Sequence, residues 1–246
     1  MKSIVVIPAR YGSSRLPGKP LREIAGKSLI ERVYQCALES KLADDVIITT
    51  DDERIREKAV SFGAPVVMTS PHCPSGTDRV CQAVSGVEAD IIVNLQGDEP
   101  QIRGDMIDAL IAAVKEEKVG MATLCSFISD PHDYQSPHSV KVVTDKNGFA
   151  LYFSRAPIPF MQRTVARPLY KHVGIYGFSR DFLEIFVSLP KGSLEECESL
   201  EQLRALEAGH PIKVLRVDYD GIGIDTEEDL KRANEMLAAT EAGFRK

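Results

Sequence analysis

Short apolar runs alternate with stretches of helical periodicity through the first half of the chain. The runs typical of buried strands lie at 4–7, 46–48, 66–68, 91–95 and 122–127, and the helical patterns between them lie at 28–40, 52–62, 76–84 and 105–117. Repeated strand-helix-strand units pair their strands in parallel and cover both faces of the sheet with helices. The alternation therefore predicts an α/β fold with a Rossmann-like, mostly parallel sheet.

The regular alternation ends near residue 128. Residues 140–143 and 150–153 predict a hairpin with Asn147-Gly148 at its turn. Later strands are expected at 173–178 and 212–217, and later helices at 193–208 and 226–239. Ser28 with Glu31 and Ser193 with Glu196 form capping-box patterns at two helix starts. We expect one domain over 1–246 and, embedded in it, an excursion from the sheet over about 128–210.

Composition excludes several classes of protein. The formal net charge of -6 argues against general nucleic-acid binding. No apolar run approaches the roughly 18 residues of a membrane span, and Met1-Lys2-Ser3 leads directly into a strand pattern without a signal peptide. The five cysteines form no C-x-x-C pair, and His72-Cys73 with Cys81 lacks the second spaced pair of a zinc site. We expect a cytoplasmic protein with reduced thiols.

The segment from Pro8 to Pro20 is unusually rich in groups that bind anions. It follows the first strand and holds three cations, two serines and two glycines. Ligands bind at the carboxyl edge of open α/β sheets, and exposed backbone N–H groups with Arg and Lys suit a polyphosphate. Gly12 and Gly18 are separated by five residues and Pro20 follows Lys19, so the P-loop pattern does not fit, and G-x-G-x-x-G is absent. The alternative is a solvated basic connection.

Two aspartates are candidates for binding a divalent cation. Asp98 follows Gly97 directly after the apolar run at 91–95, and Asp225 follows the Gly-Ile-Gly sequence at 221–223. Mg²⁺ takes carboxylate oxygens together with substrate phosphates. The alternatives are structural: Asp98 would cap the following turn, and Asp225 or Thr226 would cap the last helix.

Two further segments offer polar groups near strand ends. Residues 75–79, Ser-Gly-Thr-Asp-Arg, open a helix whose free N–H groups can hold a polar ligand. Asp51-Asp52 invites comparison with the D-x-D metal motif of glycosyltransferases, although Asp52 suits the cap of the next helix better. Arg155, His172, Tyr176, Glu201 and Gln202 have ordinary structural readings, and their spacing alone assigns them no function.

Five segments together resemble the 3-deoxy-manno-octulosonate cytidylyltransferases, also called CMP-Kdo synthetases. They are Ile7–Pro20, Asn94–Pro100, Tyr152–Arg155, Lys171–Tyr176 and Leu200–Arg204. The first segment indicates only the wider sugar nucleotidyltransferase superfamily, and the last three segments narrow the resemblance to the Kdo enzymes. The resemblance runs from the first strand to the last helix and does not distinguish lipopolysaccharide from capsule synthesis.

The resemblance implies that CTP and Kdo react to give CMP-Kdo and pyrophosphate in a Mg²⁺-dependent transfer. The implied triphosphate cradle comprises Arg10, Ser13, Ser14, Arg15 and Lys19, with Arg15 and Lys19 stabilising the departing pyrophosphate. The implied cytidine contacts are Pro8, Ala9, Ser75, Gly76 and Arg79, and the implied Mg²⁺ ligands are Asp98 and Asp225. The implied Kdo contacts are Gln96, Arg155, His172, Tyr176, Glu201 and Gln202.

The resemblance also implies a homodimer, with the excursion over about 128–210 as the dimer surface. Two other functions stay open at this point. One is a cytidylyltransferase for another acidic sugar such as sialic acid, and the other is a non-catalytic nucleotide-binding protein.

Overall fold

The computed structural model describes residues 1–12, 15–163 and 168–243. The chain divides into two compact units. The first unit comprises Lys2–Ala89, Asn94–Asp108 and Gly221–Lys246, and the second comprises Met1, Asp90–Val93 and Ala109–Asp220. The expected excursion lies within the second unit.

Parallel strands form the sheet of the first unit. β1 (Ser3–Ala9) pairs with β4 (Asp45–Thr50), and β4 pairs with β5 (Val66–Met68). The side chains of Val5, Val6 and Ile7 are fully buried, as expected of a strand covered on both faces. Strand β6 (Ile91–Leu95) ends in this unit, so the loop that carries Asp98 begins at a strand end here.

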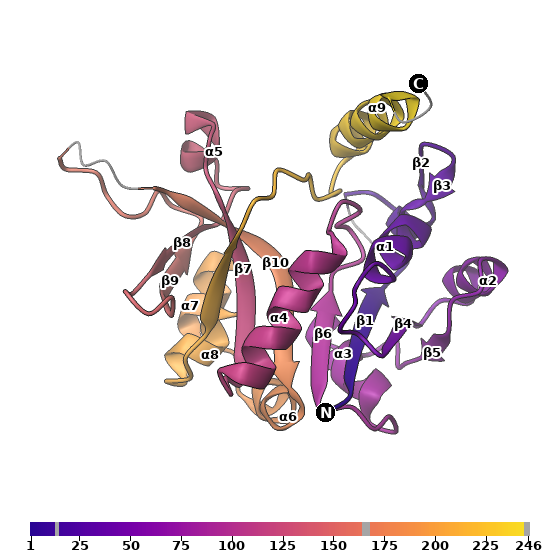
Figure 1. Ribbon diagram of the computed structural model, residues 1–246, viewed down its shortest axis with the longest axis horizontal. Helices are drawn as coiled ribbons and strands as arrows, with labels where there is room; N and C mark the ends of the chain where they lie inside the picture. The colour runs from indigo at the N-terminus through magenta and orange to yellow at the C-terminus, as the bar shows by residue number, and fades with distance from the viewer. Residues whose placement is uncertain (13–14, 164–167, 244–246) are drawn as a thin grey trace. The chain divides into compact units, whose positions relative to one another are not determined.

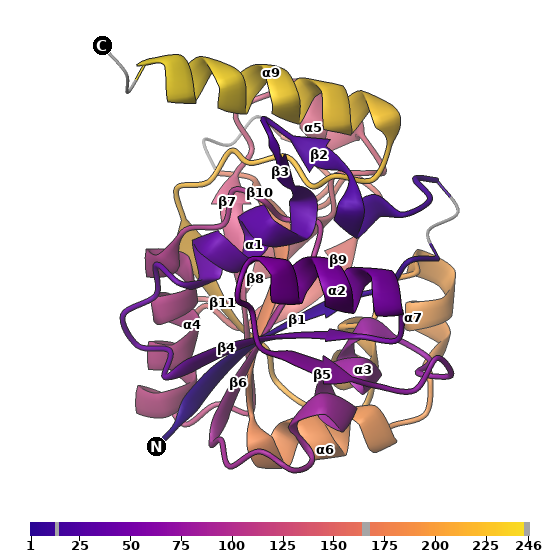
Figure 2. The same cartoon turned by 90° about the vertical axis from the view of Figure 1, so that its right-hand side faces the viewer.

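Helices cover both faces of these strands. In Figure 2, α1 (Leu29–Ala37) and α2 (Glu53–Ser61) lie on one side of β1, β4 and β5, and α3 (Gly76–Val84) lies on the other. The remaining elements are the short η1 (Lys19–Leu21), the hairpin of β2 (Glu23–Ile24) and β3 (Lys27–Ser28), and α9 (Glu227–Gly243). Helix α4 (Gly104–Glu116) begins in the first unit and ends in the second.

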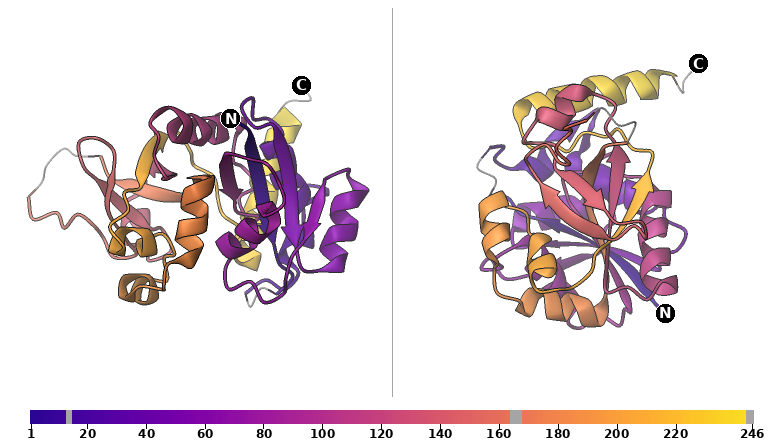
Figure 3. Two further views of the ribbon diagram at one scale, coloured as in Figure 1. Left: turned by 90° about the horizontal axis from the view of Figure 1, so that it is seen from below. Right: turned by 90° about the vertical axis from the view of Figure 1, so that its left-hand side faces the viewer.

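The sheet of the second unit is mixed. β7 (Met121–Phe127) pairs in parallel with β11 (Lys213–Val217) and antiparallel with β10 (Tyr170–Ser179). β8 (Lys141–Thr144) pairs with β10 and with β9 (Ala150–Ser154), and these strands are labelled in Figure 1 and seen side by side in the right panel of Figure 3. The predicted hairpin is confirmed: Gly148 has φ +81°, and Asp145 Oδ1 accepts from the N–H of Asn147 at 2.8 Å.

The predicted helix over 193–208 is wrong in one respect, because the structure divides it. α7 (Ser193–Glu198) and α8 (Leu203–Glu207) are separated at Ser199, which has a left-handed φ of +51°. Gly192, not Ser193, is the N-cap of α7, and the Ser193 hydroxyl donates to Glu207 at 3.0 Å. The break places Glu201 and Gln202 outside regular helix.

The other capping-box prediction also fails. Ser28 occupies the N-cap position of α1, but its side chain makes no capping hydrogen bond, and its buried Oγ has no partner among the described residues. Helices α5 (Pro131–Gln135) and α6 (Arg180–Ser188) were not expected. Phe182, Leu183 and Phe186 bury one stripe of α6, so helical spacing was present to indicate it.

The α/β class with a mixed, mostly parallel sheet is confirmed. No disulfide joins the five cysteines, all of which lie in the described residues. Among the described helices, none combines the length and the apolar character that crossing a lipid bilayer would demand.

Candidate functional site

The loop after β1 is closed on itself in the first unit. The N–H of Gly18 donates to the carbonyl of Tyr11 at 3.1 Å, and Gly18 has φ +66°, which favours glycine. The Arg54 guanidinium lies 3.3 Å above the Tyr11 ring centroid. This closure brings the chain directly to Lys19. Ser13 and Ser14, which the resemblance places in the triphosphate cradle, lie outside the described residues.

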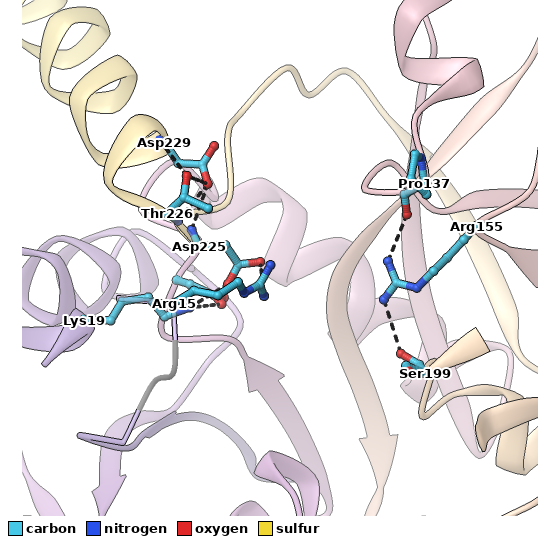
Figure 4. Close-up of polar contacts among 9 residues, drawn as sticks. Arg15, Lys19, Pro137, Arg155, Ser199, Asp225, Thr226 and Asp229 are labelled. Atoms are coloured by element: carbon cyan, nitrogen blue, oxygen red, sulfur yellow. Dashed lines mark hydrogen bonds and ion pairs between the residues drawn. The ribbon is translucent and has the colours of Figure 1, made fainter. Parts of the chain in front are cut away.

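Lys19 lies between the two candidate metal ligands. Its Nζ donates to Asp98 Oδ2 at 2.7 Å and to Asp225 Oδ1 at 3.1 Å, and its side chain is only 16% exposed. Arg15 Nη2 lies 2.9 Å from Asp225 Oδ2, as Figure 4 shows. Burial alone would lower the pKa of Lys19, but the two carboxylates outweigh burial, so its pKa is raised. Lys19 is therefore an ammonium at neutral pH.

Two loops that are far apart in the sequence hold these aspartates together. The N–H of Ile224 donates to the carbonyl of Asp98 at 2.9 Å, which joins the loop after β6 to the segment before α9. A Cβ on Gly97 would lie 3.0 Å from the carbonyl oxygen of Pro8, so glycine permits this close approach to β1. The predicted convergence of Asp98 and Asp225 follows from these contacts.

The capping alternatives are decided by the same region. Thr226 Oγ1 accepts from the N–H of Asp229 at 3.2 Å, and the Asp229 carboxylate accepts from the N–H of Thr226 at 2.9 Å (Figure 4). Thr226 and Asp229 thus cap α9, and the carboxylate of Asp225 contacts Arg15 and Lys19 instead. The carboxylate of Asp98 likewise contacts Lys19.

The first turn of α3 carries a buried arginine. Ser75 caps this helix by accepting from the N–H of Asp78 at 3.1 Å, and Gly76 follows it. Arg79 is 4% exposed; its Nη1 donates to Thr69 Oγ1 at 2.6 Å, and its Nη2 lies 3.1 Å from Asp51 Oδ2. The implied cytidine contacts Ser75, Gly76 and Arg79 therefore share one helix turn.

The adjacent acids Asp51 and Asp52 have different partners. Asp52 caps α2, accepting from the N–H of Arg54 at 3.0 Å, and it also pairs with the guanidinium of that residue. Asp51 pairs with Arg79. The described residues contain no cluster of three or more His, Cys, Asp or Glu side chains that could hold a metal ion. The cap predicted for Asp52 is confirmed, and nothing here supports a D-x-D metal motif.

Gln96 lies in the first unit, next to the start of α3. Its Nε2 donates to Asn94 Oδ1 at 3.0 Å, and Asn94 Nδ2 donates to Thr77 Oγ1 at 3.1 Å. A Cβ on Gly76 would lie 3.7 Å from both Gln96 Oε1 and Pro8 Cγ. These two hydrogen bonds, which link Thr77, Asn94 and Gln96, thus hold the Gln96 amide beside the end of β1.

His172 and Tyr176 come together in the second unit through a strand irregularity. Residues four apart in a regular strand lie about 13 Å apart, but the register of β10 shifts between Val173 and Tyr176, and the two ring centroids are 5.5 Å apart. Burial lowers the pKa of His172 to about 3, and its Nε2 lies 2.9 Å from Thr123 Oγ1. Burial raises the pKa of Tyr176. Both rings are therefore uncharged at neutral pH.

Gln202 contributes an amide to the same cluster. Its Oε1 accepts from the Tyr176 hydroxyl at 3.1 Å. Gln202 is 2% exposed, and its Nε2 has no hydrogen-bond partner among the described residues. An unpaired buried donor is costly, so this amide suits a ligand oxygen. Glu201, its neighbour, lies 4.0 Å from Arg204.

Arg155 forms a clamp on the backbone of the second unit. Its guanidinium donates to the carbonyl of Glu198 at 2.7 Å. It also donates to the carbonyls of Pro137 at 3.0 Å and Ser199 at 3.4 Å, the two contacts drawn in Figure 4. The Glu198 carboxylate accepts from the N–H of Arg155 at 2.9 Å. These contacts stabilise the break between α7 and α8, and a contact between Arg155 and the sugar stays a prediction.

Sequence reasoning missed the partners that hold these residues in place. They are Asp51 and Thr69 for Arg79, Asn94 and Thr77 for Gln96, and Glu198 for Arg155. Asn94 and Asp51 stand inside segments that the sequence already singled out. Their roles depend on pairs distant in sequence, so no local spacing could have indicated them.

A family model described as cytidylyltransferase matches residues 4–214. The chain belongs to the cytidylyltransferase family. A 3-deoxy-manno-octulosonate cytidylyltransferase of Thermodesulfovibrio yellowstonii is 49% identical, covering 96% of this chain and 98% of that relative. An 8-amino-3,8-dideoxy-manno-octulosonate cytidylyltransferase of Shewanella baltica is 44% identical, covering 97% of this chain and 99% of that relative.

One solved structure agrees with this membership of the cytidylyltransferase family, and another shares the fold. The structure of CMP:2-keto-3-deoxy-manno-octonic acid synthetase complexed with CTP matches with a TM-score of 0.93 at 42% identity, covering 98% of this chain and 100% of that one. A cytidylyltransferase from Leptospira borgpetersenii matches with a TM-score of 0.64 at 21% identity, covering 97% of this chain and 87% of that one. The second match shows the fold alone.

Proposed function

We propose that this cytidylyltransferase transfers CMP from CTP to the anomeric hydroxyl of 3-deoxy-manno-octulosonate (Kdo), releasing pyrophosphate. The observation that carries the proposal is the cluster in which Lys19 contacts both Asp98 and Asp225 beside Arg15. It lies at a strand end where α/β proteins bind ligands. Relatives named for Kdo at 45–49% identity over nearly their full length support the choice of sugar.

The reaction requires the protein to position the substrates and neutralise charge more than to form covalent bonds itself. The anomeric oxygen attacks the α-phosphorus of CTP, and the bond to the pyrophosphate oxygen breaks. Arg15 and Lys19 provide positive charge for the departing pyrophosphate, and Arg10, exposed directly after β1, adds a third cation. Lys19 is pre-positioned by its two carboxylate partners, so little reorganisation is needed during the reaction.

Asp98 and Asp225 are the residues that would hold Mg²⁺. Both direct a carboxylate oxygen at one cationic centre, the Lys19 ammonium. Two carboxylates completed by substrate phosphate oxygens are the donor set that Mg²⁺ prefers, so the residues fit. When bound, the ion supplies Lewis-acid charge at the phosphate oxygens.

The uncharged cluster in the second unit suits a polyhydroxylated sugar acid. The Gln202 Nε2 offers a donor, and the neutral His172 imidazole and Tyr176 phenol offer both donors and acceptors without a net charge. Glu201 and Arg155 complete the proposed sugar contacts in this unit, and a contact between Gln96 and the sugar stays a prediction.

A second candidate substrate is 8-amino-3,8-dideoxy-manno-octulosonate. The observation that favours it is the set of Shewanella relatives named for this sugar at 44–45% identity. The two sugars differ at one carbon, where an ammonium replaces a hydroxyl. Kdo is the better supported of the two, because the relative at 49% identity is named for it.

A pyrophosphate-release assay tests the proposal. The enzyme is incubated with Mg²⁺, each of the four nucleoside triphosphates in turn, and Kdo, 8-amino-Kdo or sialic acid. We expect the highest kcat/KM with CTP among the nucleotides and with Kdo among the sugars. A higher kcat/KM with 8-amino-Kdo or sialic acid would transfer the assignment to that sugar, and CTP binding without turnover on any acid would indicate a non-catalytic binding protein.

We also propose a cytoplasmic homodimer, since CTP is made in the cytoplasm and the second unit exposes large apolar side chains. Phe160 is 86% exposed, Leu151 63% and Phe127 56%. A monomeric mass by light scattering at micromolar concentration would contradict the dimer, and fractionation of cells would check the location.

A further inference from the structure

The burial of Arg79 is unusual because a guanidinium is costly to remove from water. Such a charge is found buried only where it is paired and hydrogen-bonded. Here two residues from separate segments hold it: Asp51, directly after β4, at 3.1 Å, and Thr69, directly after β5, at 2.6 Å. The Thr69 hydroxyl is itself held, since it donates to the carbonyl of Thr50 at 3.2 Å. The Arg79 guanidinium therefore has one fixed orientation.

This guanidinium projects from the helix turn that adjoins the end of β1. Helix α3 packs against β1 and β4, and a Cβ on Gly76 would lie 3.7 Å from Pro8 Cγ. Pro8, Ala9, Ser75, Gly76 and Arg79 are the residues that the resemblance assigns to cytidine. A base bound there lies beside the first turn of α3, which carries Arg79.

A guanidinium can only donate hydrogen bonds. It has five N–H groups, and Asp51 and Thr69 each engage one of its terminal nitrogens. Cytosine presents two adjacent acceptors, N3 and O2, whereas uracil presents an N3–H donor beside O2. A fixed pair of donors suits the first pattern and opposes the second, whereas a mobile guanidinium could turn away from the uracil N3–H and donate to O2 alone.

We propose that Asp51, acting with Thr69, is a positioning residue that makes Arg79 select cytosine over uracil. The inference rests on the proposed function in that it assumes a CTP site at this end of β1. Asp51 neither binds metal nor touches the reacting phosphorus in this proposal. It acts only by fixing the direction of the Arg79 donors.

The neighbouring acid provides a matched control. Asp52 has the same chemistry one residue later, but its carboxylate caps α2 and pairs with the exposed Arg54. Asp51→Asn and Asp52→Asn therefore make the same chemical change at adjacent positions, and only the first changes the partner of Arg79.

The experiment measures kcat and KM for CTP and UTP with Kdo, and the dissociation constants of both nucleotides by titration without sugar. For Asp51→Asn we expect KM and Kd for CTP to rise about tenfold, kcat to change less than about threefold, and the preference for CTP over UTP to fall about tenfold. Thr69→Val should lower the preference in the same direction, and Thr69→Ser, which keeps the hydroxyl, should preserve it. Asp52→Asn should leave both preference and KM unchanged.

Two results would overturn the inference. One is an unchanged preference in both Asp51→Asn and Thr69→Val, and the other is an equal weakening of CTP and UTP, which would mean that Asp51 supports the site without selecting the base. The binding titrations keep this test separate from the proposed reaction. A protein that prefers CTP in binding but transfers CMP to no sugar would refute the proposed function and still decide the role of Asp51.

Discussion

Replacing Lys19 with methionine tests the centre of the proposed site. Lys19→Met keeps the length and apolar stem of the side chain and removes only the ammonium. In the structure that ammonium is 2.7 Å from Asp98 and 3.1 Å from Asp225. Its loss leaves two carboxylates facing each other, with Arg15 as the remaining cationic partner of Asp225.

The expected effects on folding and on turnover differ in size. Asp225 is 46% exposed, so solvent screens its pair with Lys19, and we expect the two lost pairs together to cost about 1–2 kcal/mol of stability. For a chain of this length that lowers Tm by roughly 5 °C. Loss of one charged donor to a departing group typically costs about 10²–10³ in kcat, or about 3–4 kcal/mol. Turnover at 25 °C should thus fall far more than stability explains.

The assay is pyrophosphate release under saturating CTP and Kdo, with Tm measured on the same preparation. Lys27→Met is the matched control, because Lys27 lies in the neighbouring hairpin and its exposed Nζ donates to Gln35 Oε1 at 2.8 Å. We expect native kcat in the control and a fall of at least about 10² in Lys19→Met. A fall of less than about threefold with a lowered Tm would remove Lys19 from the mechanism and leave it a structural role.

Other expected outcomes concern the acids and the buried histidine. Asp98→Asn and Asp225→Asn should each abolish nearly all pyrophosphate release while circular dichroism stays native, and near-native turnover with Mg²⁺ in either would argue against the metal assignment. His172 has a pKa near 3 in the folded protein against an ordinary 6.5. As pH falls, the unfolded chain is protonated at this residue before the folded protein is, so the free energy of unfolding decreases between pH 6.5 and pH 3. The urea midpoint of His172→Asn should therefore fall less between pH 7 and pH 4.5 than that of the native protein, and parallel falls would contradict the burial argument. The raised pKa of Lys19 keeps its side chain protonated up to pH values above 10.5, so deprotonation of Lys19 should cause no loss of kcat between pH 7 and 9. A fall of kcat in that pH range that disappears in Lys19→Met would contradict this expectation.

Local patterns predicted the elements whose signals lie within a few residues. The apolar runs predicted the strands of the first unit, Asp52 predicted a helix cap, and Asn147-Gly148 predicted a hairpin turn. The continuous helical pattern over 193–208 was misleading, because its break at Ser199 is stabilised by the guanidinium of Arg155, more than 40 residues earlier. Periodicity contains no information about such a partner.

The sequence by itself determined the α/β class, and it predicted an anion-binding first loop and two acids suited to a divalent cation. Each of these depends on residue type and on position relative to a strand end, and both are visible locally. Only the tertiary structure decided which carboxylate does what: Asp98 and Asp225 meet at Lys19, Asp51 holds Arg79, and Asp52 caps a helix. A carboxylate has the same chemistry in all four places, and its partner is set by which loops the fold brings within hydrogen-bonding distance.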